Sequence, residues 1–108
     1  MSLDLPKPIA AYFAADRIDT ETVARCFTDN AVVVDEGQTY GGLAAIKEWK
    51  TAASKKYTYT SEPIVSDKRD GKVIVTSRVT GNFPGSPLDL RYLFGLDGLK
   101  IASLEIVL

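Results

Sequence analysis

The sequence predicts a single α+β domain in which helices come first and a mostly antiparallel sheet follows. Apolar residues recur at helical spacing in most of the first half, whereas in the second half they alternate along strands divided by turn signals. The chain of 108 residues has the common size of one domain, and no linker, repeat or low-complexity segment divides it. In such proteins the helices gather on one face of the sheet.

Two short helices are expected before residue 30. The first spans roughly residues 7–16, because Pro6 and Pro8 suit the entry to a helix. Its apolar face contains Ile9, Tyr12 and Phe13. The second helix begins at a cap formed by Asp19 or Thr20. The residues expected to be buried on it are Val23, Cys26 and Phe27.

A strand, a tight turn and a third helix follow. Residues 31–35 are rich in β-branched side chains and predict a strand that ends at Asp35. Glu36-Gly37 turns the chain, so that residues 38–40 can pair back. The third helix opens at Gly41-Gly42. Its apolar positions at helical spacing are Leu43, Ile46, Trp49 and Ala53.

Four strands are expected in the second half of the chain. Their predicted bounds are 57–65, 72–83, 88–96 and 100–107. One face of the third strand is apolar and should look inward; it consists of Leu88, Leu90, Tyr92 and Phe94. Glu105 alternates with its neighbours on the last strand in a way that allows it to face inward or outward.

Apolar residues also remain on strand faces that should point outward. They are Ile74, Leu93, Ala102 and Leu104. A sheet face in contact with water is not expected to collect such residues. The sequence therefore predicts a homodimer that buries them.

The composition excludes several classes of partner. The net charge of −1 provides no basic surface for nucleic acid. No stretch approaches the roughly 20 apolar residues of a membrane-spanning helix, and the start of the sequence lacks the pattern of a signal peptide. We therefore expect a cytoplasmic protein without membrane contact.

Missing residue types remove whole mechanisms. The chain has no histidine, which excludes Ser-His-Asp and Cys-His relays and histidine-ligated zinc. Its single cysteine, Cys26, cannot form an intramolecular disulfide or a thiolate metal cluster, and is expected to be a buried small side chain. Neither a calcium-loop spacing nor a glycine-rich phosphate-binding motif occurs. We expect neither a metal site nor a cofactor.

Asp35 is the candidate for chemistry because it is a carboxylate at the end of the apolar run Val32-Val33-Val34. Such an acid either reaches solvent or lies at the mouth of an apolar cavity, and a carboxylate in the second position is a chemical site. The alternative is that Asp35 only ends the strand and caps the turn through its side chain.

Three motifs resemble the SnoaL-like branch of the nuclear transport factor 2-like superfamily, and the likeness extends over nearly the whole chain. They are Phe-Thr-Asp-Asn-Ala-Val-Val-Val-Asp at 27–35, Tyr-Gly-Gly-x-x-Ala-Ile-Lys-Glu-Trp at 40–49, and the closing segment that begins Leu-Arg-Tyr-Leu-Phe at residue 90. The resemblance implies a cone-shaped fold: three helices packed in the concave face of a curved sheet, with an apolar pocket open at one end. It also implies dimers. Members include ketosteroid isomerase, polyketide cyclases and dehydratases, so the fold alone does not name a reaction.

The resemblance assigns roles to two residues and departs from the pattern at a third. Asp35 lies where the ketosteroid isomerase branch has its general base, and Tyr12 lies where that branch has the tyrosine of its oxyanion hole. The position of the protonated aspartic acid that completes that oxyanion hole is occupied by Leu90. Loss of one such donor costs roughly 2.7–4 kcal/mol of transition-state stabilisation.

Two main functions remain open, and a scaffold role within a larger assembly is a third option. In the first, the domain is a cofactor-independent isomerase, cyclase or dehydratase: Asp35 removes a proton next to a carbonyl while Tyr12 donates to the developing enolate. The ligand is a small apolar molecule, with contacts expected from Phe13, Trp49, Tyr57, Leu90, Tyr92 and Phe94. In the second, the domain is a non-catalytic ligand-binding or dimerisation module in which Asp35 is structural. Convergence of Asp35 and Tyr12 on one apolar cavity favours the enzyme, and a filled core favours the module.

Overall fold

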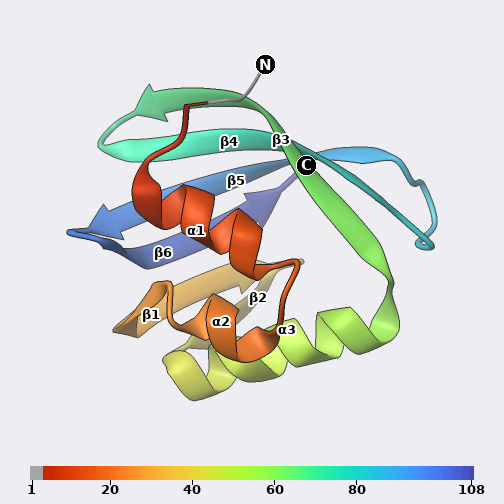
Figure 1. Cartoon of the computed structure of the whole chain (residues 1–108), viewed down its shortest axis with the longest axis horizontal. Coiled ribbons are helices and arrows are strands. Elements are labelled where there is room, and N and C mark those ends of the chain that lie inside the picture. The colour runs from red at the N-terminus through yellow and green to blue at the C-terminus, as the bar shows by residue number, and fades with distance from the viewer. Residues whose placement is uncertain (1–3) are drawn as a thin grey trace.

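A computed structural model describes residues 4–108, which form one curved sheet with three helices on its concave face (Figure 1). The helices are α1 (Lys7–Ala15), α2 (Thr20–Ala24) and α3 (Leu43–Lys56). The strands are β1 (Phe27–Asp35), β2 (Gln38–Gly41), β3 (Tyr59–Arg69), β4 (Lys72–Gly81), β5 (Leu88–Asp97) and β6 (Lys100–Val107). Their order in the sheet is β2-β1-β6-β5-β4-β3. Only β1 and β6 are parallel, so the predicted α+β class is confirmed.

The helices begin where the sequence predicts. Pro6 precedes α1 and accepts its first backbone hydrogen bonds. The backbone N–H of Thr22 donates to Asp19 Oδ1 at 2.8 Å, which confirms Asp19 as the cap of α2. Gly42, with φ of 86°, occupies the position before α3 in a conformation that favours glycine.

The predicted second helix is too long at its end. α2 stops at Ala24, and Phe27 is the first residue of β1 rather than part of a helical face. The reason is the parallel pairing with β6: the backbone N–H of Ile101 donates to the carbonyl of Cys26 at 2.8 Å, and Phe27 is opposite Ile101 in the register. Tertiary strand pairing thus overrides the helical spacing, although Phe27 is buried as expected.

Further strand boundaries differ from the prediction: β3 continues to Arg69 rather than residue 65, and two other differences shape the region of the cavity. β3 begins at Tyr59 rather than residue 57, because α3 continues to Lys56 and Tyr57 is its C-cap. β4 ends at Gly81, so Phe83 lies in the loop before β5. In that loop the amide oxygen of Asn82 accepts a hydrogen bond from the backbone N–H of Thr58 at 2.9 Å, which ties the loop to the end of α3.

Leu104 was expected on the outer face of the sheet, and this prediction is wrong. Leu104 is 1% exposed and belongs to the core. The register between β5 and β6 shifts so that Ala102 has no partner on β5, and this bulge interrupts the alternation of the strand. Ile101 and Leu104 therefore both point inward although they are three residues apart. Glu105, next in the strand, is exposed.

Aromatic rings form the centre of the core, between α1 and the sheet. Tyr12 lies edge-on to Phe27 and Phe94, with ring centroids 6.0 Å and 5.6 Å apart. Cys26 is half-buried, and its thiol donates to the carbonyl of Thr22 at 3.6 Å. Burial raises the pKa of this thiol, as expected for a packed side chain rather than a reactive one.

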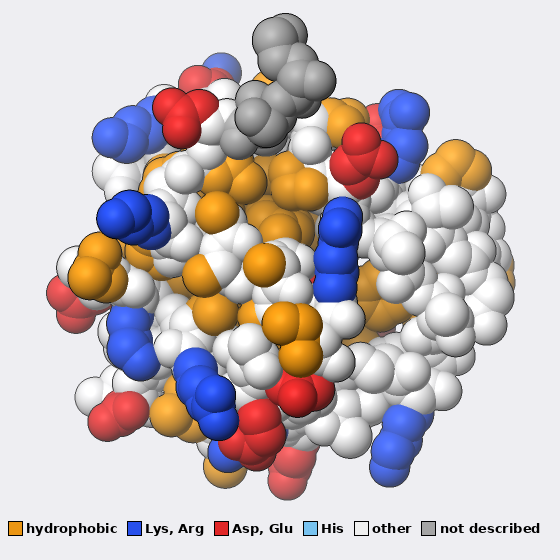
Figure 2. Space-filling model, viewed as in Figure 1, with side chains coloured by type: hydrophobic (Ala, Val, Ile, Leu, Met, Phe, Trp, Pro, Cys, Tyr) orange, Lys and Arg blue, Asp and Glu red, His pale blue; other side chains and the backbone are white. Residues whose placement is uncertain are grey.

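The surface carries both signs of charge. Acidic and basic side chains alternate around the margin of the face that includes α1 (Figure 2). On the outer side of the sheet, Arg78 Nε donates to Asp89 Oδ1 at 3.0 Å, with both side chains exposed. Within residues 4–108, no helix has the length and apolar character needed to cross a membrane.

Candidate functional site

A cavity of about 700 Å³ lies between α3, the beginning of β3 and the inner face of β5. This volume is in the range of small-molecule sites, which are also mainly apolar. Seven aromatic side chains contribute to its lining: Tyr12, Tyr40, Trp49, Tyr57, Tyr59, Phe83 and Tyr92. The core is therefore not filled, and a small molecule has space to bind.

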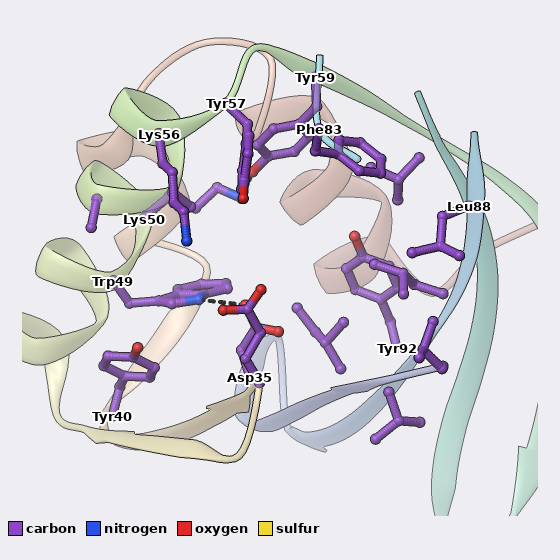
Figure 3. Close-up of a pocket in the computed structure, with 18 of the residues that line it drawn as sticks. Asp35, Tyr40, Trp49, Lys50, Lys56, Tyr57, Tyr59, Phe83, Leu88 and Tyr92 are labelled. Carbon is purple, nitrogen blue, oxygen red and sulfur yellow. Dashed lines mark hydrogen bonds between the residues drawn. The ribbon is translucent and has the colours of Figure 1, made fainter. Parts of the chain in front are cut away.

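Asp35 points into this cavity from the end of β1 (Figure 3). Its Oδ2 accepts a hydrogen bond from the indole Nε1 of Trp49 at 2.9 Å, which fixes the carboxylate against α3. Among residues 4–108, no second hydrogen bond to this carboxylate is formed. The adjacent turn consists of Glu36 and Gly37 with φ of 53° and 75°, and the Asp35 side chain does not cap it.

Tyr12 reaches the same cavity from α1. It is 1% exposed, and within the described part of the chain its hydroxyl has no hydrogen-bond partner. Burial raises the pKa of Tyr12 well above its ordinary value, and the charges of Asp16 and Asp35 act in the same direction. The hydroxyl thus keeps its proton and can donate it to a ligand. Asp35 and Tyr12 line one concave, largely apolar cavity.

Four of the six side chains expected to contact a ligand line the cavity, namely Trp49, Tyr57, Leu90 and Tyr92. Phe13 and Phe94 do not line it, so the cavity gives no support to these two as ligand contacts. Both belong to the packed core, where their ring centroids are 5.9 Å apart. The alternation along the strand places Phe94 inward, but it lies beyond Tyr92 and further from the cavity.

A polar pair behind the cavity holds Tyr92. The hydroxyl oxygens of Ser61 and Ser77 are 2.6 Å apart, and Ser61 Oγ is 3.4 Å from the hydroxyl of Tyr92. Burial raises the pKa of Tyr92, although the hydrogen bond from Ser61 opposes the shift. Tyr92 is therefore another neutral phenol in the lining.

Sequence reasoning missed a charged cluster in the wall of the cavity. Lys50, on α3, is only 4% exposed. Its ammonium forms an ion pair with Asp16 and donates a hydrogen bond to the hydroxyl of Tyr59 at 2.6 Å. It also lies 5.0 Å and 5.8 Å from the ring centroids of Trp49 and Tyr12, within cation–π range.

The helical spacing contained the signal for this cluster. Lys50 is four residues after Ile46 and three before Ala53, so it belongs to the apolar stripe of α3. Asp16 likewise follows Tyr12 by four residues, at the end of the buried face of α1. A cation and an acid on two buried helix faces predict a buried ion pair.

Metal chemistry has little support in the side chains. Within residues 4–108, no three of the His, Cys, Asp or Glu side chains are grouped so as to hold a metal ion. Two acids line the cavity: Asp35, which is hydrogen-bonded to Trp49, and Glu36, which is exposed.

Comparison with solved structures identifies the family. A protein from Sinorhizobium meliloti, named "putative polyketide cyclase", is 42% identical to this chain. Each chain covers 98% of the other, and the two superpose with a TM-score of 0.92. This chain belongs to the same polyketide cyclase-like family as that protein. Its fold is that of nuclear transport factor 2-like proteins, so the resemblance found in the sequence is confirmed.

Two more distant members of the superfamily share the fold. One is a Catenulispora acidiphila protein with a ketosteroid isomerase-like fold, solved in complex with trimethylamine: identity 18%, TM-score 0.84, coverage 97% of this chain and 87% of the other. The second is a nuclear transport factor 2-like protein of unknown function from Cytophaga hutchinsonii: identity 12%, TM-score 0.73, coverage 98% and 92%. No protein-family model and no curated protein matches this sequence.

Proposed function

We propose that the cavity binds a small, mainly apolar carbonyl compound and that Asp35 acts on it as a general base, in a cofactor-independent reaction of the isomerase or cyclase type. The position of Asp35 carries this proposal. A carboxylate with a single neutral hydrogen-bond donor, Trp49, points into an aromatic cavity large enough for such a ligand.

The chemistry balances without a co-reactant. Asp35 takes a proton from the carbon next to the carbonyl, the C–H electron pair forms the enolate double bond, and the carbonyl π electrons move to its oxygen. The neutral hydroxyl of Tyr12 donates a hydrogen bond to that oxygen as its charge develops. Return of the proton to a different carbon completes an isomerisation. In a cyclisation, the enolate carbon attacks a second carbonyl of the same substrate, the π electrons of that carbonyl move to its oxygen, and this oxygen takes the proton back from Asp35.

The relatives support a small-molecule ligand in general terms. The Sinorhizobium meliloti protein is named for a cyclase activity, and the Catenulispora acidiphila protein binds trimethylamine. Neither name specifies a substrate for this chain, and the aromatic lining is the better guide to ligand class.

The test combines binding and turnover. Trp49 is the only tryptophan, and its indole bonds to Asp35, so its fluorescence should report occupancy of the cavity. We expect an activated cyclic enone to change this fluorescence and to be isomerised by the wild type. Asp35→Asn retains an acceptor for Trp49 but no base, so it should bind the enone and lose turnover by at least about a hundredfold. Tyr12→Phe should lose less turnover than Asp35→Asn. Equal turnover by the wild type and Asp35→Asn would refute the base role.

The alternative is a non-catalytic ligand-binding module. The observation in its favour is the Trp49–Asp35 hydrogen bond, which gives the carboxylate a structural partner that joins the end of β1 to α3. Binding of enones or other apolar carbonyl compounds without turnover by the wild type would make this the better reading.

We also propose that the domain forms a homodimer through the outer face of the sheet. Ile74 and Leu93 are opposite each other in the β4–β5 register, and Leu93 is opposite Glu105 on β6. Val34 of β1 lies on the other side of Glu105. The row also continues from Ile74 to the exposed Asp67 on β3. Its apolar positions are Ile74, Leu93 and Val34, and a partner chain covering them would remove this apolar area from water.

A further inference from the structure

Burial of the cluster of Asp16, Lys50 and Tyr59 costs free energy of desolvation, and the cluster has no part in the chemistry proposed so far. The side chains of Lys50 and Asp16 are 6% and 7% exposed. Desolvation of such a pair usually exceeds its Coulombic gain, and apolar residues of similar size would often be more stable. Yet Asp16 is the C-cap of α1, whereas Lys50 and Tyr59 come from α3 and β3 and line the cavity.

The hydrogen bond within the cluster has only one possible direction. An ammonium group donates and never accepts, so the phenolic oxygen of Tyr59 is the acceptor of the 2.6 Å contact with Lys50 Nζ. The phenolic proton of Tyr59 must therefore point elsewhere. In the described part of the chain no acceptor for this proton is found, and Tyr59 lines the cavity (Figure 3).

The Lys50 ammonium makes the Tyr59 hydroxyl a stronger hydrogen-bond donor, but the hydroxyl keeps its proton. Burial raises the pKa of Tyr59, and the charge of Lys50 opposes that shift. For Lys50 itself burial favours the neutral amine, but Asp16 and Tyr59 outweigh burial and raise its pKa. At neutral pH the cluster thus contains an ammonium ion that polarises a neutral phenol, and hydrogen bonds in such chains strengthen one another.

We infer that Tyr59 is a second catalytic hydrogen-bond donor to the substrate oxygen, beside Tyr12, and that Lys50 and Asp16 are the positioning residues that polarise it. This inference rests on the proposed function of the same cavity. Tyr59 would replace the hydrogen-bond donor of the oxyanion hole that is lost because Leu90 occupies the position of the aspartic acid. The ligand it implies is a compound whose oxygen becomes anionic, an enolate or a phenolate, with that oxygen between Tyr12 and Tyr59 and its reacting carbon toward Asp35.

Binding of 4-nitrophenol tests the donor without requiring turnover. Its phenolate absorbs visible light and imitates an enolate, whereas nitrobenzene has nearly the same shape and no oxyanion. Both are titrated against Asp35→Asn, which imitates the base after it has taken the proton and does not repel the anion. Tyr59→Phe in this background should weaken 4-nitrophenolate binding by at least about tenfold, and nitrobenzene binding by less than about twofold.

The role of the Lys50–Asp16 ion pair is tested with a variant that does not leave one buried charge without its partner. Asp16→Asn with Lys50→Met removes both charges together, and in the same background it should also weaken the phenolate selectively. The matched control is Arg78→Met with Asp89→Asn, which removes an exposed pair from the outer face and should change neither ligand. Circular dichroism confirms that each variant is folded.

Each outcome decides a separate point. Equal losses for 4-nitrophenolate and nitrobenzene, or no loss in Tyr59→Phe, overturn the donor role of Tyr59. Selective loss in Tyr59→Phe but not in the charge-free double variant overturns the role of Lys50 and Asp16 alone. Selective loss of 4-nitrophenolate binding in both Tyr59→Phe and the charge-free double variant supports the oxyanion site. If the wild type in addition has no enone turnover, Asp35 is refuted as a base while the oxyanion site stands.

Discussion

Replacing Lys50 with methionine should destabilise the protein by about 3–5 kcal/mol, because it leaves a buried acid without a partner. Methionine preserves most of the length and apolar packing of the lysine stem, so lost contact area contributes little. The cost comes from Asp16, whose side chain is 7% exposed and whose ion pair with Lys50 would be gone. Loss of the hydrogen bond to Tyr59 adds to it.

This loss is large for a domain of 108 residues. Domains of this kind have a total free energy of unfolding of about 5–15 kcal/mol. At about 4 °C per kcal/mol, the melting temperature of Lys50→Met should fall by about 12–20 °C. Asp16→Asn should also be destabilising, since it leaves the Lys50 ammonium without its counter-charge.

A double-mutant cycle of Lys50→Met, Asp16→Asn and the double variant tests this, with the free energy of unfolding of each protein measured by urea unfolding and circular dichroism. The double variant should be clearly more stable than the sum of the single losses predicts, with an interaction energy of at least about 1–2 kcal/mol. The exposed Arg78–Asp89 pair, taken through the same cycle, should show little coupling. A loss below about 1 kcal/mol in Lys50→Met, or additive single losses, would refute the reasoning.

Three further results are expected. Phe27→Ala should cost about 3–5 kcal/mol in urea unfolding, since Phe27 is 1% exposed; a cost under about 1 kcal/mol would contradict its place in the core. Stability should decline above about pH 10, because Lys50 and the buried cavity tyrosines have pKa values raised above the ordinary 10.5 and 10.0, so unfolding releases protons there; constant stability from pH 9 to about pH 11 would count against these shifts. Leu93→Glu should favour the monomer in sedimentation experiments, and a wild type that is already monomeric at micromolar concentration would remove the dimer proposal.

The order and type of the elements could be predicted because local signals agree with the fold. The Asp19 cap, the glycine turns and the alternation along β5 all act over a few residues, and each appears where the sequence places it. The errors occur where distant segments decide. Parallel pairing with β6 extended β1 back to Phe27, and a bulge at Ala102 reversed the orientation of Leu104.

The residues of the candidate site also include some that the sequence predicted and one that it did not. Asp35 and Tyr12 were found from a strand end and a resemblance, and both reach the cavity. Lys50 was not, because a lysine within an apolar stripe of a helix is ordinarily assigned to the surface. The helical spacing places both Lys50 and Asp16 on buried faces, but their pairing with each other depends on a contact between two helices that are far apart in sequence.

The last residues of the chain form part of the rim of the cavity. Val107 and Leu108 line it, Leu108 is 74% exposed, and its carbonyl oxygen accepts a hydrogen bond from Arg91 at 2.8 Å. Any polypeptide that continues from Leu108 therefore starts at the entrance. An affinity tag fused there would compete with ligands for access, and binding or turnover should be measured on protein from which such a tag has been removed.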